Sequence, residues 1–225
     1  MDYLAICRAV RSESGISGGG PASVVNQSGL LARMVGWAQD AYSTIQQEDV
    51  WSFRWRRATP SLQTGVASYQ PANLGVADLG PVFVDGVYLN TAALPRLTWM
   101  PWSQIDRLPA QTGVPSRFAR RPDGALVFHP TPDATHQLRI DYLRNTHVLV
   151  DNTDVPLWSN EMQQKAIVFS ALMMYADHAA DPDAMRRGQR GYEVARTLMA
   201  AEFLDSIDGR PLTLGAIDRN RPLLT

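Results

Sequence analysis

The spacing of apolar residues changes twice along the chain, and this change constrains the fold most strongly. Between residues 28 and 48 apolar side chains recur every three or four positions, as on one face of a buried helix. Between residues 58 and 149 prolines and glycines separate short runs rich in Val, Leu, Tyr, Phe and Thr, which favours strands. Helical spacing returns at residue 160. We therefore expect an α+β fold, in which helices from both ends of the chain form one body and the middle of the chain forms an inserted antiparallel β lobe.

The helical pattern predicts a bundle of about four helices, at residues 3–13, 28–48, 160–179 and 182–206. Asn26 or Ser28 is expected to cap the second helix. Asn160 is expected to cap the third, with Gln163 as its capping-box partner. Asp181 followed by Pro182 is typical of the start of a further helix. The predicted core stripe of the third helix is Met162, Ala166, Phe169, Met173 and Ala176.

Within the β region, Asp85-Gly86 lies between two β-rich runs, which predicts a hairpin over residues 81–89 with a two-residue type I′ turn. A second hairpin is expected to join residues 116–119 to residues 125–128. The run 137–143 alternates polar and apolar residues and predicts a strand with one buried face. A short helix is expected within residues 103–108.

The predicted domains are a discontinuous helical body (1–57 and 150–208), the inserted β lobe (58–149) and an extended tail (209–225). The tail has two prolines, two glycines and no apolar period, so it cannot form a core of its own. It is expected to dock on another molecule through five apolar side chains: Leu212, Leu214, Ile217, Leu223 and Leu224.

Composition excludes several classes of protein. The 21 basic and 22 acidic residues give a formal charge of −1, which disfavours a general DNA-coating role. Cys7 is the only cysteine, so an internal disulfide or thiolate metal cluster is excluded. The first residues do not resemble a secretory signal, and the longest apolar run, 166–176, is shorter than the roughly 20 residues of a membrane span. We expect a protein that is neither exported by a signal peptide nor membrane-bound.

Motifs for catalysis are weak. Gly15 to Gly19 matches the G-x-S-x-G string of an esterase, but the residues before Ser17 are charged and helical, whereas that motif needs a preceding strand. The four histidines lack metal-ligand spacing, and the only lysine, Lys165, lies within a predicted helix and in no phosphate-binding loop. We therefore expect no enzyme activity, cofactor or metal. Esterase activity at Ser17 stays an alternative, which Ser17→Ala would test.

Two basic groups have candidate binding roles. Residues 51–57 interleave aromatic residues with Arg54, Arg56 and Arg57, and a second group contains Arg186, Arg187 and Arg190. Interleaving of this kind can bind single-stranded nucleic acid by stacking and charge. The other interpretation is that the aromatic residues anchor the crossing into the β lobe while the arginines contact a neighbouring subunit or partner. The near-zero net charge favours this second interpretation.

The order of these segments resembles the head-to-tail adaptor, or connector, proteins of tailed bacteriophages. The resemblance covers about residues 1–206 and rests on the order of segments 15–24, 46–53, 123–133, 138–143, 149–158 and 166–172. It implies a structural protein of the virion neck, made in the host cytoplasm, that assembles as a ring, expected to be a dodecamer, beneath the portal protein. It also implies that the ring extends the DNA channel without specific DNA binding and docks a downstream tail or nozzle protein.

The alternative is a phage tail or baseplate accessory protein. Its β lobe would bind a glycan or another tail protein, with Trp99, Trp102 and Trp158 as stacking surfaces.

Overall fold

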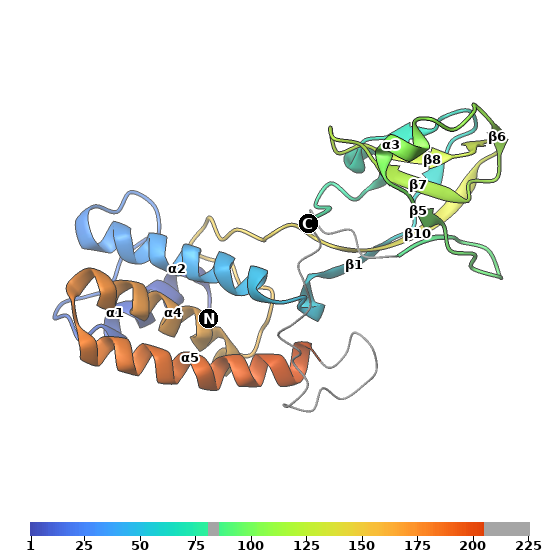
Figure 1. The fold of residues 1–225 in the computed structure, drawn as a ribbon. Coiled ribbons are helices and arrows are strands. Elements are labelled where there is room, and N and C mark those ends of the chain that lie inside the picture. The colour runs from blue at the N-terminus through green and yellow to red at the C-terminus, as the bar shows by residue number, and fades with distance from the viewer. Residues whose placement is uncertain (81–85, 205–225) are drawn as a thin grey trace. The chain divides into compact units, whose positions relative to one another are not determined.

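The computed structural model describes residues 1–80 and 86–204 of the chain. These residues form two compact units: the first contains Met1–Phe53 and the described residues from Thr146 onward, and the second contains Arg54–Asn145. The first unit is helical and the second consists mainly of short strands (Figure 1). The fold is therefore α+β, as the sequence predicts. The predicted division into a helical body, a β lobe and a tail as separate domains stays a prediction.

The first unit is built from four long helices that match the predicted ones. They are α1 (Tyr3–Glu13), α2 (Gly29–Glu48), α4 (Glu161–Ala179) and α5 (Pro182–Phe203). Helix α4 packs against α1, α2 and α5 (Figure 1). No described helix combines the length and the apolar character needed to cross a membrane.

The starts of the later helices are fixed by the expected caps. The Asn160 side chain accepts a hydrogen bond from the Met162 amide, and Asp181 accepts from the amides of Asp183 and Ala184. The predicted capping-box role of Gln163 is wrong. Its side chain is buried and donates to the Leu198 carbonyl and the Glu202 carboxylate, which lie on α5. Packing between helices therefore takes precedence over the local cap.

The core of the first unit surrounds α4 and includes two fully buried tryptophans, Trp51 and Trp158. The Trp51 indole donates to the Ile45 carbonyl at 2.6 Å, so its polar edge is satisfied. Met162 is not part of this core, contrary to the predicted stripe, because 52% of its surface is exposed. The fully buried aliphatic side chains from the helices include Ile6, Val10, Met34, Ala38, Ile167, Ala171 and Leu172.

The second unit is organised around strand β10 (His136–Leu143). Its antiparallel neighbours are β1 (Trp55–Ala58), β2 (Ser61–Leu62) and β4 (Val87–Leu89). Because β10 alternates, Leu138, Ile140 and Tyr142 point into the core. Alternation along the predicted strand 137–143 is thereby confirmed.

A second sheet has the strand order β3–β8–β7–β5. The predicted hairpin 116–128 is confirmed here, since β7 (Arg117–Arg120) pairs antiparallel with β8 (Leu126–His129). Strands β3 (Ser68–Tyr69) and β5 (Thr98–Trp99) lie at its edges, and β6 (Thr112–Gly113) pairs with β9 (Thr131–Pro132). Single turns of helix occur at η1 (Ser52–Arg54), η2 (Pro71–Leu74) and α3 (Trp102–Ile105). The last begins one residue before the predicted range 103–108 and ends within it, at Ile105.

The predicted hairpin at residues 81–89 is only partly within the described chain. Residues 81–85, which include half of the predicted Asp85-Gly86 turn, lie outside the described residues. The following strand, β4, pairs with β10.

Two glycines of α5 allow it to approach α4 closely, and one of them gives a test of this packing. A Cβ built on Gly188 would lie 2.7 Å from Met173 Cγ and 3.1 Å from the Phe169 carbonyl oxygen. Gly188→Ala is therefore expected to lower the free energy of unfolding by about 1–3 kcal/mol, measured by urea denaturation. The matched control is Gly36→Ala on α2, where the added methyl meets no atom within 4 Å. There the higher helix propensity of alanine should raise stability by roughly 0.5–1 kcal/mol. Equal effects at the two positions would contradict the packing.

Candidate partner-binding surfaces

The three predicted binding arginines have different environments. Arg54 is 9% exposed and donates to the Arg144 carbonyl at 2.8 Å, and burial lowers the pKa of its guanidinium. Arg56 and Arg57 are exposed on β1. Arg56 and Arg57 are therefore accessible to a partner, whereas Arg54 holds the start of β1 to Arg144, the residue that follows β10. The five predicted tail anchors, from Leu212 to Leu224, lie outside the described residues.

Arg57 forms part of an ion-pair cluster on the sheet surface. Its Nε donates to Asp141 Oδ1 at 2.6 Å, and Arg139 donates to Asp141 Oδ2 through Nε at 3.0 Å and Nη2 at 2.7 Å. The Arg139 guanidinium also lies over the Tyr88 ring. Burial of Asp141 favours a higher pKa, but the hydrogen bonds from Arg57 and Arg139 outweigh it and hold the pKa of this carboxyl below its ordinary value. One carboxylate shared by two guanidinium groups leaves this cluster a formal charge of +1.

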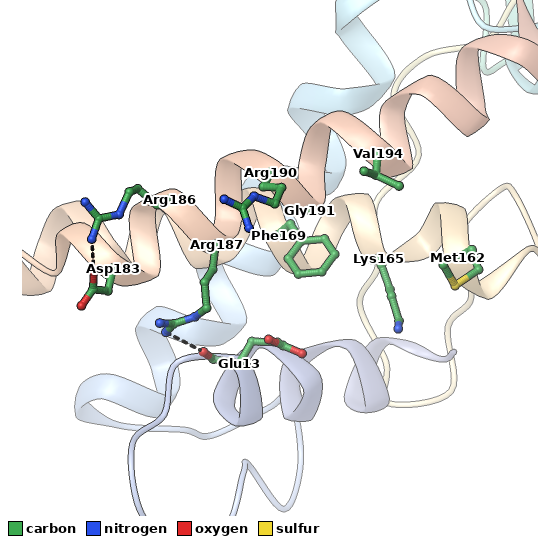
Figure 2. A pocket seen from close by; sticks show the side chains of 10 residues that line it. All are labelled: Glu13, Met162, Lys165, Phe169, Asp183, Arg186, Arg187, Arg190, Gly191 and Val194. Carbon is green, nitrogen blue, oxygen red and sulfur yellow. Dashed lines mark hydrogen bonds and ion pairs between the residues drawn. The ribbon is translucent and has the colours of Figure 1, made fainter.

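A furrow on the first unit is a further candidate surface. It has a volume of about 640 Å³ and follows the line of α4 between the end of α1 and the first half of α5 (Figure 2). Phe169 lies at its floor beneath Gly191, where any Cβ would contact the ring. The furrow is lined by Glu13, Met162, Lys165, Phe169, Asp183, Arg186, Arg187, Arg190, Gly191 and Val194.

The furrow combines an apolar floor with a basic rim. Met162 and Val194 are each more than half exposed, and four basic side chains outnumber two acidic ones. Arg186 pairs with Asp183, and Arg187 donates to the Glu13 carbonyl at 3.4 Å (Figure 2). Lys165 and Arg190 form no hydrogen bond or ion pair with any described residue. Such a surface fits a partner segment that carries both apolar and acidic side chains.

The sequence pointed to only part of this furrow. The sequence shows a basic group of Arg186, Arg187 and Arg190, but its patterns give Lys165 no binding role and place Met162 and Phe169 in the predicted core stripe. The signal that could have located the surface is the one lysine of the chain, Lys165, three residues from Met162 and therefore on the same face of α4.

The described residues show few features of a catalytic or metal-binding site. They hold no group of three or more His, Cys, Asp or Glu side chains arranged to bind a metal. Ser17 lies in the loop after helix α1, so it is not preceded by the strand that a nucleophile elbow requires. Cys7 is fully buried, and burial raises the pKa of its thiol to about 12, which keeps it in the unreactive thiol form.

The tryptophans of the alternative function are not equivalent. Trp158 is buried against Tyr42 and Phe53 and belongs to the core, so it offers no stacking surface to a partner. Trp102 is half-buried with the Arg121 guanidinium over its ring. Trp99, half exposed on edge strand β5, stays available as an apolar contact.

Comparison with known proteins places these surfaces on a phage structural protein. Residues 1–221 match the family described as SU10 adaptor protein. No curated protein sequence matches the chain. Because the family match covers nearly the whole chain, the protein belongs to the SU10 adaptor protein family, a family of phage head-to-tail adaptors.

The pairing of Arg57 with Asp141 gives a pH-dependent prediction. A carboxyl with a lowered pKa contributes stability above its unfolded pKa, and this contribution is lost as the pH falls through the folded pKa. In Arg57→Gln the pKa of Asp141 should rise toward its ordinary value, so the acid loss of stability begins at a higher pH. Carboxyl-carbon NMR titration measures this directly. Arg56→Gln, on the neighbouring residue, is the control and should leave the pKa of Asp141 almost unchanged. An Asp141 pKa equal in wild type and Arg57→Gln would show that the pair is absent in solution.

Proposed function

We propose that this protein assembles as a ring beneath the portal protein, extends the DNA channel in the virion neck and docks a downstream tail or nozzle protein. The observation that supports this most is the match of residues 1–221 to a phage adaptor family. A formal charge of −1 agrees with the role, because a conduit with many phosphate contacts would retain the DNA that must slide through it. The proposed role is structural and not catalytic, and the proposed ring is a dodecamer.

In this proposal, Arg56 and Arg57 contact a neighbouring subunit or the portal and do not bind DNA. Arg56 is exposed on β1, and Arg57 shares the carboxylate of Asp141 with Arg139. An exposed guanidinium can donate several hydrogen bonds to carbonyl or carboxylate groups of a partner protein.

The ring assay is negative-stain electron microscopy of the full chain with and without a purified portal ring. We expect the free protein to be monomeric or weakly associated and to form rings on the portal template. Arg56→Glu should reduce ring occupancy, whereas Arg117→Glu, an exposed arginine of β7, serves as the charge-matched control. A stable ring from the protein alone would contradict the need for a template. A steep salt-dependent affinity for DNA would contradict the proposed role of the arginines.

The alternative, a tail or baseplate accessory protein, is supported by one observation, the exposed Trp99 on an edge strand. The same microscopy separates the two proposals. An accessory protein would leave portal rings undecorated, and its binding to a tail protein or glycan would depend on Trp99.

We further propose that residues 209–225 anchor the ring to the portal. About 17 residues at roughly 3.3 Å each span on the order of 55 Å when extended, which is enough to reach another molecule. The five apolar side chains named above would bury surface there, and Pro211 and Pro222 would reduce the entropy lost on docking.

Truncation after Ser206 tests the anchor. The melting temperature should be nearly unchanged, because we expect this tail, which has no apolar period, to contribute little to the helical core. Affinity for the portal should fall by about tenfold or more, equivalent to about 1.4 kcal/mol. The full-length variant Leu212→Ser/Leu214→Ser is the companion and should lose part of the same affinity. Unchanged docking of the truncated chain would place the attachment on the helical unit instead.

A further inference from the structure

Apart from Val25 and Val50, the exposed large apolar side chains described in the first unit lie in two places. One is the furrow, where Met162 and Val194 are followed by the exposed Leu198 one turn further along α5. The other is the valine loop, defined here as residues 148–155. Val148, Val150 and Val155 in this loop are 54%, 61% and 59% exposed. Several large apolar side chains exposed within one short segment indicate a contact surface.

The valine loop is held in place, so its valines are exposed in a fixed arrangement. The Asp154 carboxylate accepts hydrogen bonds from the amides of Val150 and Asp151 at 2.6 and 2.8 Å. The Asp154 carbonyl accepts from the Tyr3 amide at 2.7 Å, at the start of α1. A loop ordered in this way loses little conformational entropy when a partner covers it.

The loop and the furrow have complementary chemistry. The loop presents valines beside the exposed carboxylate of Asp151 and the partly exposed carboxylate of Asp154. The furrow presents an apolar floor beside Lys165 and Arg190, which have no ionic partner among the described residues. If the valines of the loop packed against Phe169 and Val194, Asp151 could lie near Lys165. The apolar groups of both surfaces would then be buried and the charged groups paired.

The two surfaces lie on different parts of the same unit. The loop is bonded to the first residues of α1, whereas the furrow runs from Glu13, the last residue of that helix, to Met162 and Lys165 on α4. A contact between two different patches repeats from copy to copy, which is the kind of contact that closes a ring.

We propose that the valine loop of one copy docks in the furrow of the next copy, with Asp151 beside Lys165 and Arg190. This inference rests on the proposed ring and names the subunit contact within it. The occupant of the furrow is thus a second copy of this chain.

The single lysine makes the contact testable by zero-length carbodiimide cross-linking, which joins a carboxylate to an amine in ion-pair contact. Isotope-labelled and unlabelled full-length copies are mixed at high concentration and cross-linked, and the products are identified by mass spectrometry. We expect dimers and larger products that contain a Lys165–Asp151 link between labelled and unlabelled copies. Lys165→Arg should abolish the link while keeping the positive charge, and Asp151→Asn should lower its yield severalfold.

Exchange of the charges gives a second readout that does not depend on the lysine. Arg190→Asp and Asp151→Arg should each weaken self-association in sedimentation equilibrium. The variant that carries both should recover it, because every contact then holds the reversed pair. If the double variant instead self-associates more weakly than either single variant, with the two losses adding, the proposal is contradicted.

The outcomes separate this contact from the proposed ring. Links from Lys165 to Asp205, Asp208 or Asp218 of another copy would identify the C-terminal residues as the occupant and overturn the inference. Absence of any intermolecular Lys165 link, while rings still form on the portal, would overturn the inference and leave the proposed function in place. If the wild-type chain forms no ring on the portal, the proposed function fails and this inference with it.

Discussion

Helix α4 must be enclosed on several sides at once, and the arrangement of the first unit follows from this requirement. Its buried residues include Gln163, Gln164, Ile167, Ala171 and Leu172, which do not share one face. The chain before residue 54 supplies α1 and α2, and the chain after α4 supplies α5. The helical unit therefore needs both ends of the sequence, and the second unit is an insertion between them.

Close approach of α5 to α4 has a second consequence. Gly188 and Gly191 bring the two backbones together, and Phe169 fills the space that a side chain at Gly191 would need. The same contact leaves Met162, Lys165 and Val194 uncovered along the line of α4, which forms the furrow. The close packing of α5 on α4 thus contributes to the stability of the unit and also shapes its candidate binding surface.

The long helices and the strands β4, β7, β8 and β10 could be predicted because their periodicities of 3.6 and 2 are local properties. The role of Gln163 could not, since its bond partners lie on α5, more than 30 residues away. Met162 was assigned to the core because a helix surrounded by others has an apolar pattern that does not reveal which face stays open. The exposure of the valines in residues 148–155 could not be predicted either, because an isolated apolar residue carries no local signal of whether another segment covers it.

The surfaces of this protein agree with the proposed role, in which it would bind proteins while DNA passes. Arg57 and Arg139 share the carboxylate of Asp141, and the formal charge of the chain is −1. Apolar side chains accompany the remaining exposed charge of the furrow. This combination favours protein contacts over contacts with a polyanion.

The central claim, that the chain is a ring component of the neck, is tested most directly by electron microscopy of phage particles. Averages of the neck should be compared between particles assembled with this protein and particles assembled without it. The account predicts a ring of density directly beneath the portal in the first sample and its absence in the second. An unchanged neck in particles that lack the protein would contradict the account.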